Sequence, residues 1–539
     1  MRSDIIRLYK SVHTWTGIIG GLALFIAFYA GALTVFKEPI ARWASPPSLQ
    51  QVDSISLEDT PALISHAVRT NPEAAKSLHL YLTPSEHLPG RVSWEIQPEG
   101  ADDHDTLSNQ YRVASLQTDG TVLTEQAKPS RLADFIDTLH RVVGLPVDSE
   151  VNRWVMGVVA VLYSLALVSG VIVLLPTLVK DFFALRLGKN LKRMWLDAHN
   201  VVGIASLPLH LVMALTAVVF AYHDGIYSLQ DVVIHDGKMR EIFRAAQPPA
   251  AVDQPTNPDM LLPPAELVAR AQAQSPGFEP HMLQYLAVTT PRAVVRVWGH
   301  DRTAIAPRAP GGFVPINPYT GEVLSTEFLP GKQSAASTTV SSFFALHFAN
   351  YGGNTVRWAY FLLALAGAWL FFSGNLLWVE SRRKKQRKTA PLPKQRTDVS
   401  IMANLTVGVS LGCIGGISLT IAAAKWLNGH VDDLTAWHQY VYYAVFFGSV
   451  AWAFVRGAAR ASIDLLRVAA AFTFFIPLTS LLAWVLPSMG MWAHQSPATL
   501  GVDLTALVAG GCFVWMASAT SRRVYQGVPQ DSVWSYKKA

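Results

Sequence analysis

KRMWLDAHNVVGIASLPLHLVMALTAVVFAYHD, from Lys192 to Asp224, is a long apolar stretch that opens on two basic residues and carries three histidines. At about 1.5 Å of rise per residue, a helix of this length covers the roughly 30 Å hydrocarbon core of a bilayer. An ionisable side chain inside such a segment is costly, so it usually marks a functional site. The histidines of this stretch, His199, His210 and His223, are therefore the first candidate functional residues.

The composition predicts a polytopic α-helical membrane protein. Half of the 539 residues are hydrophobic and only 15% are charged, which is unusual for a soluble protein. The first apolar run follows a basic segment, as in a signal peptide, but it is too long and lacks a small-residue cleavage site, so we expect an uncleaved anchor. The apolar runs predict eight spans, at residues 14–36, 154–176, 198–222, 355–379, 403–427, 437–457, 463–486 and 500–520.

The distribution of Lys and Arg predicts the orientation. Basic residues gather after the even-numbered spans, for example in RRKKQRK at Arg382 to Lys388, whereas the loops after the fifth and seventh spans contain none. The positive-inside rule then places both termini in the cytoplasm and two long segments, residues 40–150 and 224–350, outside.

Each long outer segment reads as a small α+β domain. A helix-like start, PALISHAVRT at Pro61 or PAELVARAQAQ at Pro264, is followed by alternating runs such as RVSWEI at Arg91 and AVVRVW at Ala293. Asn-Pro and Thr-Gly in INPYTGEVL at Ile316 predict a turn between strands. The histidines of these segments have no ligand spacing, so we expect surface positions for His66, His79, His87, His104, His235, His281 and His300.

The first four spans contain an internal repeat. Both halves carry a His-x3-Gly element, a Leu-His pair, and an Arg-Trp followed by Ser-Gly at the same spacing. Parallel repeats imply a pseudo-twofold axis along the membrane normal. The matching elements are His13 with Gly17 and His199 with Gly203, His140 and His347, and Arg153-Trp154 to Ser169-Gly170 and Arg357-Trp358 to Ser373-Gly374.

That axis pairs His13 with His199 near the cytoplasmic face and His140 with His347 near the outer face. Two imidazoles that face each other across an apolar helix bundle suit a bis-histidine b-type haem, so we expect two haems, one at each face. His210 ranks below these four histidines as a ligand, because its repeat equivalent is Leu24. For His210 alone, a buried histidine that forms hydrogen bonds between helices is an equally good interpretation. Candidate propionate contacts near these histidines are Arg7, Arg141, Arg193 and Arg357.

Other cofactors have no support in the sequence. Cys413 and Cys512 are the only cysteines and both lie in predicted spans, which excludes a C-x-x-C-H haem attachment and an iron–sulfur cluster held by this chain alone. No dinucleotide or Walker motif is present, so the electron donor must lie elsewhere. Of the remaining histidines, we expect His430, His438 and His494 at interfaces and not on a metal.

These motifs, in this order, resemble the PepSY-associated transmembrane family of bacterial inner membrane proteins, which includes ferric-siderophore reductases of the ferrioxamine type. The resemblance rests on His13-x3-Gly17, Leu139-His140-Arg141, His199-x3-Gly203, NPYTGEVL at Asn317 and Leu346-His347. It implies a haem-bearing inner membrane reductase with PepSY domains in the periplasm. The first such domain is degenerate around Thr118 to Gly120, and the spans beyond residue 400 depart from shorter members.

We therefore expect transmembrane electron transfer, from a cytoplasmic reductase or membrane quinol to a periplasmic ferric siderophore, with no nucleic-acid partner. Two alternatives stay open: a membrane-anchored regulatory or binding protein, and a siderophore or iron transporter. We also expect that removal of residue 400 onward leaves both haems bound. The predicted segments are the first span (1–39), the first periplasmic domain (40–150), the second span (151–178), a cytoplasmic loop with the third span (179–223), the second periplasmic domain (224–350), the fourth span (351–380), a basic cytoplasmic linker (381–400), the last four spans (401–521) and a cytoplasmic tail (522–539).

Overall fold

The computed structural model describes residues 3–46, 56–83, 91–98, 100, 107–116, 120–127, 129–179, 191–241, 257–304, 311–384, 394–494, 496–526 and 533–536. The chain divides into two compact units, each of which is described by itself. The helical unit comprises Met1–Pro46, Ser130–Ala221 and Ala359–Ala539, and the sheet-bearing unit comprises Pro47–Pro129 and Tyr222–Trp358. The predicted basic loop at residues 180–190, most of the run at 382–388, and His87 and His104 lie outside the described residues.

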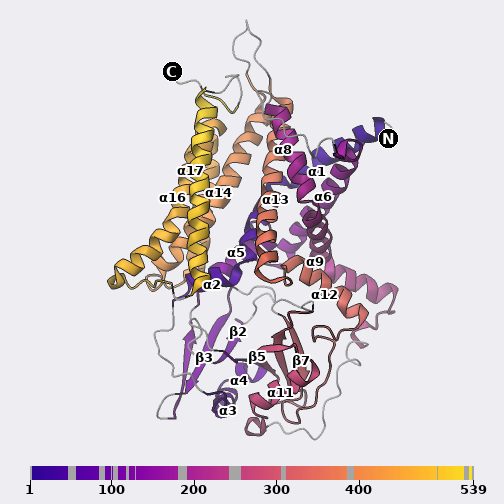
Figure 1. Ribbon diagram of the computed structural model, residues 1–539, viewed down its shortest axis with the longest axis vertical. Helices are drawn as coiled ribbons and strands as arrows, with labels where there is room; N and C mark the ends of the chain where they lie inside the picture. Colours follow the sequence, from indigo (N-terminus) through magenta and orange to yellow (C-terminus); the bar gives the residue numbers. More distant parts are fainter. Residues whose placement is uncertain are drawn as a thin grey trace. The chain divides into compact units, whose positions relative to one another are not determined.

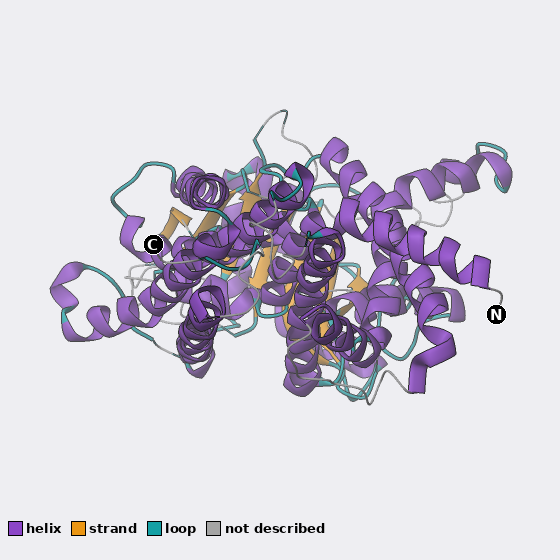
Figure 2. Cartoon of the chain, turned by 90° about the horizontal axis from the view of Figure 1, so that it is seen from above, coloured by secondary structure: helices purple, strands orange, loops and turns teal. Residues whose placement is uncertain are grey.

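Long helices dominate the helical unit, and several of them are seen end-on in Figure 2. In Figure 1 the C-terminal helices α14, α16 and α17 run side by side. Two of the helices, α9 and α13, continue into the sheet-bearing unit. The helices are α1 (Ser3–Thr34), α2 (Lys37–Ala44), α5 (Leu132–Arg141), α6 (Glu150–Leu174), α8 (Leu191–Ala205), α9 (Leu207–Val233), α13 (Gly353–Arg382), α14 (Thr397–Leu427), α15 (Leu434–Arg456), α16 (Ala458–Val485) and α17 (Pro497–Gln526).

Among the described residues, seven helices are long and apolar enough to cross a membrane: α1, α6, α9, α13, α14, α16 and α17. The prediction of eight spans was therefore too high. The sixth predicted span corresponds to α15, which is a helix but is not among the seven. The third is divided between α8 and α9 at Ser206, because Pro208 lacks a backbone N–H and its ring crowds the preceding turn.

Apolar packing joins the helices. Leu24 of α1, Val159 and Tyr163 of α6 and Ala214 of α9 form one buried cluster. A second cluster joins the end of α13 to α14, α15 and α16 through residues that include Trp378, Val399, Ala453 and Leu465. The C-terminal helices therefore share a core with the segment that precedes them.

The sheet-bearing unit contains one seven-stranded antiparallel sheet, in the order β4-β3-β2-β1-β5-β6-β7. Figure 1 shows the purple β2 and β3 and the redder β5 and β7 in this unit. The strands are β1 (Ser77–Tyr81), β2 (Val92–Ile96), β3 (Gln110–Leu116), β4 (Val122–Ala127), β5 (Glu279–Leu286), β6 (Val294–His300) and β7 (Gly312–Ile316).

Pairing of β1 with β5 merges the two segments that we expected to form two separate domains. The register runs from Ser77 opposite Leu286 to Tyr81 opposite Met282. Alternate residues of both strands, Leu78 and Leu80 with Leu283 and Tyr285, are fully buried in one core. Each half-sheet alone would leave an unpaired edge, and this pairing removes it.

The predicted local elements of this unit are confirmed. The expected helices are α3 (Thr60–Thr70) and α11 (Pro264–Gln274), and the expected runs are β2 and β6. Asn317 caps the predicted turn, because its side-chain oxygen accepts hydrogen bonds from the backbone N–H groups of Tyr319 and Thr320. The unit also contains α4 (Pro72–Lys76) and α12 (Ala335–Phe348), whereas α2 and α5, predicted within the first outer domain, belong to the helical unit.

Candidate functional site

His13 of α1 and His199 of α8 lie next to each other. Their ring centroids are 6.4 Å apart and the rings are inclined at 75°. Nδ1 of His13 is 2.8 Å from the Ala166 carbonyl oxygen, which can only accept, so Nδ1 carries the proton. Nδ1 of His199 is 2.9 Å from the Ser373 hydroxyl, which itself donates to the Leu370 carbonyl, so this Nδ1 is also the donor. Both Nε2 atoms therefore carry lone pairs, the form in which imidazole binds a metal ion.

Each of these rings lies beside a Ser-Gly pair of a neighbouring helix. A Cβ atom at Gly170 of α6 would lie 2.9 Å from Cε1 and Nδ1 of His13, so the ring fills the space that a side chain would take. A Cβ atom at Gly374 of α13 would lie 3.6 Å from Cε1 of His199, which is ordinary contact. Glycine is thus required at one of the two positions.

His210 of α9 lies in the apolar centre of the helical unit and is 1% exposed. Its Nδ1 is 2.6 Å from the Tyr163 hydroxyl, and Phe28 and Phe371 flank the ring with centroids 5.4 and 6.2 Å away. Its Nε2 is buried and has no hydrogen-bond partner among the described residues. An unsatisfied buried polar atom costs about 1–3 kcal/mol, so this nitrogen is a candidate ligand atom.

His140 of α5 lies against α1. Its Nδ1 is 2.8 Å from the Ala27 carbonyl oxygen, and a Cβ atom at Gly31 would lie 2.7 Å from the same nitrogen. Burial lowers the pKa of His140, against a smaller opposing effect of Asp137, so the ring is neutral at pH 7. Its predicted partner His347 lies on α12 in the sheet-bearing unit, and this pairing stays a prediction.

A profile of the PepSY-associated TM region family matches residues 10–381, which is well over half of the chain. The chain belongs to this family. No curated protein matches the sequence. All four predicted ligand histidines and His210 lie within the family region, whereas α14 to α17 lie beyond it.

The four arginines near the predicted ligands of this family member differ in their surroundings. Arg141 forms ion pairs with Asp148 at 2.5 Å and Asp137 at 3.5 Å. Arg193 is paired with the buried Asp197 at 3.1 Å. Two of the four candidate propionate contacts therefore form ion pairs with aspartates. Of the other two, Arg7 is exposed and Arg357 is half-buried.

Three other histidines have surroundings that the sequence spacing did not indicate, although His300 is exposed, as predicted. His438 is fully buried near the start of α15, and neither ring nitrogen has a hydrogen bond to a described residue. His281 and His300 stack with centroids 4.8 Å apart, because adjacent strands β5 and β6 bring them together. The sequence spacing held no sign of that pair, since it depends on strand register.

A buried charged cluster joins α2, which lies in the family region, to α14, α16 and α17 beyond that region. Asp503 accepts a hydrogen bond of 2.9 Å from the Trp43 indole and is 2.5 Å from His494 Nε2. The Lys425 ammonium lies 3.9 Å from the centre of the Trp43 ring and donates to the Trp492 carbonyl at 3.1 Å. Lys425 and Asp503 are ionisable residues inside predicted spans, and such residues usually mark a functional or structural site, so the sequence alone could have indicated this cluster.

Proposed function

We propose that this family member is a haem-dependent electron-transfer protein that reduces a ferric siderophore. The observation that carries the proposal is the pair of rings of His13 and His199, 6.4 Å apart, each held through Nδ1. A haem bound there would supply a one-electron Fe(III)/Fe(II) couple.

The residues present fit such a group. His13 and His199 would hold the haem iron through their Nε2 atoms, which are the ring nitrogens without a proton. Metal-binding histidines usually donate their other N–H to a carbonyl, carboxylate or similar acceptor. Ala166 and Ser373 supply those acceptors here.

The protein's own part in the reaction is to hold and insulate the electron carrier. The hydrogen bonds of His13 and His199 fix the tautomer and the ring orientation before any ligand binds. Gly170 gives the His13 ring its space. The apolar centre around Phe28 and Phe371 excludes water between the helices, and no acid or base is needed.

For a second haem we propose His140 and His347 as ligands, on the basis of the repeat in the first four spans. The equivalent surroundings of His13 and His199 support the repeat, since Ala166 and Leu370, which lie near these rings, precede Gly170 and Gly374 by the same four positions. His140 has the same protonated Nδ1 and therefore a lone pair on Nε2. His210 is the competing candidate because of its unpartnered Nε2.

The remaining roles follow from the family resemblance. We propose a bacterial inner membrane location, with both termini in the cytoplasm and the sheet-bearing unit in the periplasm. Two cytoplasmic termini require an even number of spans, so this orientation includes α15 as a further span beside the seven longest apolar helices. The donor would be a cytoplasmic reductase or membrane quinol. Reduction would release iron because the hard oxygen donors of siderophores bind ferric iron more tightly than ferrous iron. A regulatory or binding protein and a siderophore or iron transporter are the alternatives.

A difference spectrum tests the proposal directly. Protein purified from haem-replete cells is expected to show a b-type α-band in the dithionite-reduced minus oxidised spectrum, and a ferric hydroxamate added anaerobically should reoxidise it. Colourless protein would exclude the reductase and leave the two alternatives. A bound haem that no ferric chelate reoxidises would retain electron transfer but exclude this substrate class.

A further inference from the structure

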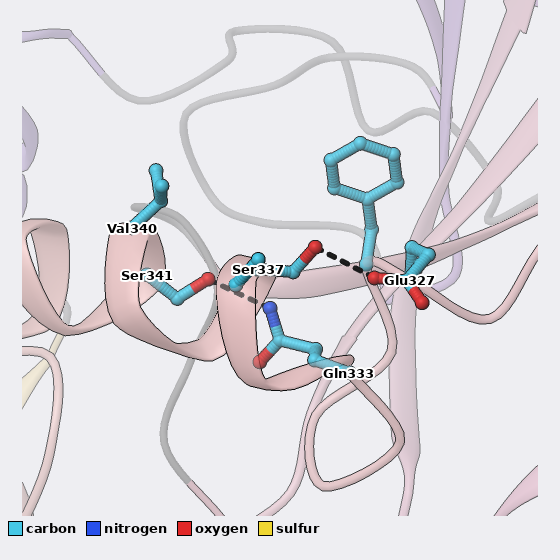
Figure 3. A pocket seen from close by; sticks show the side chains of 7 residues that line it. Glu327, Gln333, Ser337, Val340 and Ser341 are labelled. Atoms are coloured by element: carbon cyan, nitrogen blue, oxygen red, sulfur yellow. Dashed lines mark hydrogen bonds between the residues drawn. The ribbon is translucent and has the colours of Figure 1, made fainter. Parts of the chain in front are cut away.

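A cavity of about 220 Å³ lies beside the start of α12 in the sheet-bearing unit (Figure 3). Its wall comes from the segment after β7 and from the first two turns of α12. Glu327 is the one charged side chain among the seven lining residues, which are Glu327, Phe328, Gln333, Ala336, Ser337, Val340 and Ser341.

The Glu327 carboxylate is fixed through one oxygen only. Oε2 accepts hydrogen bonds from the Ser334 backbone N–H at 3.2 Å, the Ser334 hydroxyl at 2.8 Å and the Ser337 hydroxyl at 2.6 Å. Hydrogen bonds from Ser337 and Ser334 lower the pKa of Glu327, so it is ionised at neutral pH. Oε1 has no hydrogen bond to a described residue, which leaves a negatively charged acceptor at the cavity.

The same contacts argue against an anionic ligand. A helix start attracts anions through its unpaired N–H groups. At α12 the N–H of Ser334 is bonded to Glu327 and the N–H of Ser337 is bonded to the Ser334 hydroxyl. Two of the donors at this helix start are therefore occupied, and the Glu327 carboxylate would repel an anion.

We propose that this cavity binds a small primary alkylammonium ion from the surrounding solution. An ammonium group has three N–H donors, and three of the lining residues, Glu327, Ser337 and Ser341, have side-chain oxygens that can accept a hydrogen bond. Figure 3 shows the hydrogen bond between Ser337 and Glu327, with Val340 and Ser341 on the next turn of α12. The alkyl chain contacts Val340, Ala336 and Phe328. The cavity is smaller than the roughly 300–1,000 Å³ of sites for drug-sized ligands, which restricts it to short chains. This site does not depend on the proposed reductase function.

The test is calorimetric titration of the full-length protein in nanodiscs with n-butylammonium chloride, with empty nanodiscs as the blank and 1-butanol as the neutral probe of equal chain length. We expect the ammonium to bind and the alcohol to bind at least tenfold more weakly. Glu327→Gln should weaken ammonium binding at least tenfold, whereas Glu322→Gln, an exposed glutamate in the preceding turn, should leave it unchanged.

A second variant separates binding from folding. Val340 is 52% exposed, so Val340→Trp should fold, retain the three hydrogen bonds of Glu327 and fill the cavity. It should abolish ammonium binding. Equal binding of the alcohol and the ammonium, unchanged binding in Glu327→Gln, or unchanged binding in Val340→Trp would each overturn the assignment.

Discussion

The Tyr443 hydroxyl donates a hydrogen bond of 2.9 Å to the carbonyl oxygen of Gly144, in the segment between α5 and α6. Tyr442, its neighbour on α15, packs its ring against Phe135 of α5 at 5.6 Å. The helix that carries His140, α5, therefore packs against the C-terminal helix α15. This packing argues against our expectation that these helices are separable from the haem-binding part.

Removal of residues 397–539 should destabilise the protein and reduce its haem content. The truncation removes Tyr442, which packs against Phe135, and removes Asp503, which accepts a hydrogen bond from the Trp43 indole. Size-exclusion chromatography and haem content per protein measure this effect. A monodisperse truncated protein with full haem content would restore the view that the tail is an independent module. Tyr443→Phe should cost only about 1 kcal/mol, the usual value of one neutral hydrogen bond.

His13→Ala and His199→Ala should each abolish the same low-spin haem signal. An iron with two axial imidazoles becomes high-spin or is lost when either ligand is removed. Electron paramagnetic resonance and haem content decide the matter. His430→Ala, at an exposed position, is the control, and two different signals lost in the two variants would exclude a shared iron.

Substitutions at the remaining histidines show which of them bind the second haem. His140→Ala and His347→Ala should affect only that haem if the repeat-based pairing is correct. His210→Leu should then leave both signals and be tolerated, because it removes a buried unpartnered nitrogen and the Tyr163 hydroxyl can still donate to the backbone carbonyl of residue 210. Loss of a low-spin signal in His210→Leu, with no loss in the other two variants, would assign the second iron to His210.

The sequence predicted the proximity of His13 and His199 because each lies in a His-x3-Gly element at the start of a predicted span. It could not predict the single sheet, since the pairing of Leu80 with Leu283 joins residues some two hundred positions apart, and period-two patterns carry no information on partners. The buried cluster of Lys425 and Asp503 was missed for a different reason. It lies outside the repeat, and its Trp43 comes from a helix that we had assigned to an outer domain.

Asp503→Ala should destabilise the protein by about 3 kcal/mol, because it removes a charged acceptor from the Trp43 indole and leaves the Lys425 charge uncompensated in a buried site. Lys425→Met should restore part of that loss in the double variant. Thermal unfolding of the four proteins gives the coupling directly. Additive effects would show that the two charges do not interact.

Acidification should weaken the attachment of α5 to α2. Burial alone would raise the pKa of Asp137, but Lys37 at 3.0 Å, together with Arg141, lowers it further than burial raises it. A carboxylate whose folded pKa is lowered stabilises the fold fully above its unfolded value of about 3.9, and this contribution is lost as the pH falls through the folded pKa. Lys37→Met should therefore move acid unfolding to higher pH. The exposed Lys76→Met is the control, and an unchanged midpoint in Lys37→Met would contradict the assignment.

Gly170→Ala and Gly374→Ala form a matched pair that tests whether ring position governs the His13 and His199 site. The new Cβ at residue 170 would lie 2.9 Å from the His13 ring, a distance at which the ring must shift, whereas the Cβ at residue 374 would lie 3.6 Å from the His199 ring and needs no shift. Both glycines lie within long helices, where alanine is favoured by about 1 kcal/mol, so neither change should unfold the protein. We expect Gly170→Ala to alter or abolish the low-spin signal that His13→Ala removes, and Gly374→Ala to leave it intact. Since the two substitutions add the same atom to two helices of the helical unit, equal effects on the signal would show that the close contact of Gly170 with His13 does not position the ligand.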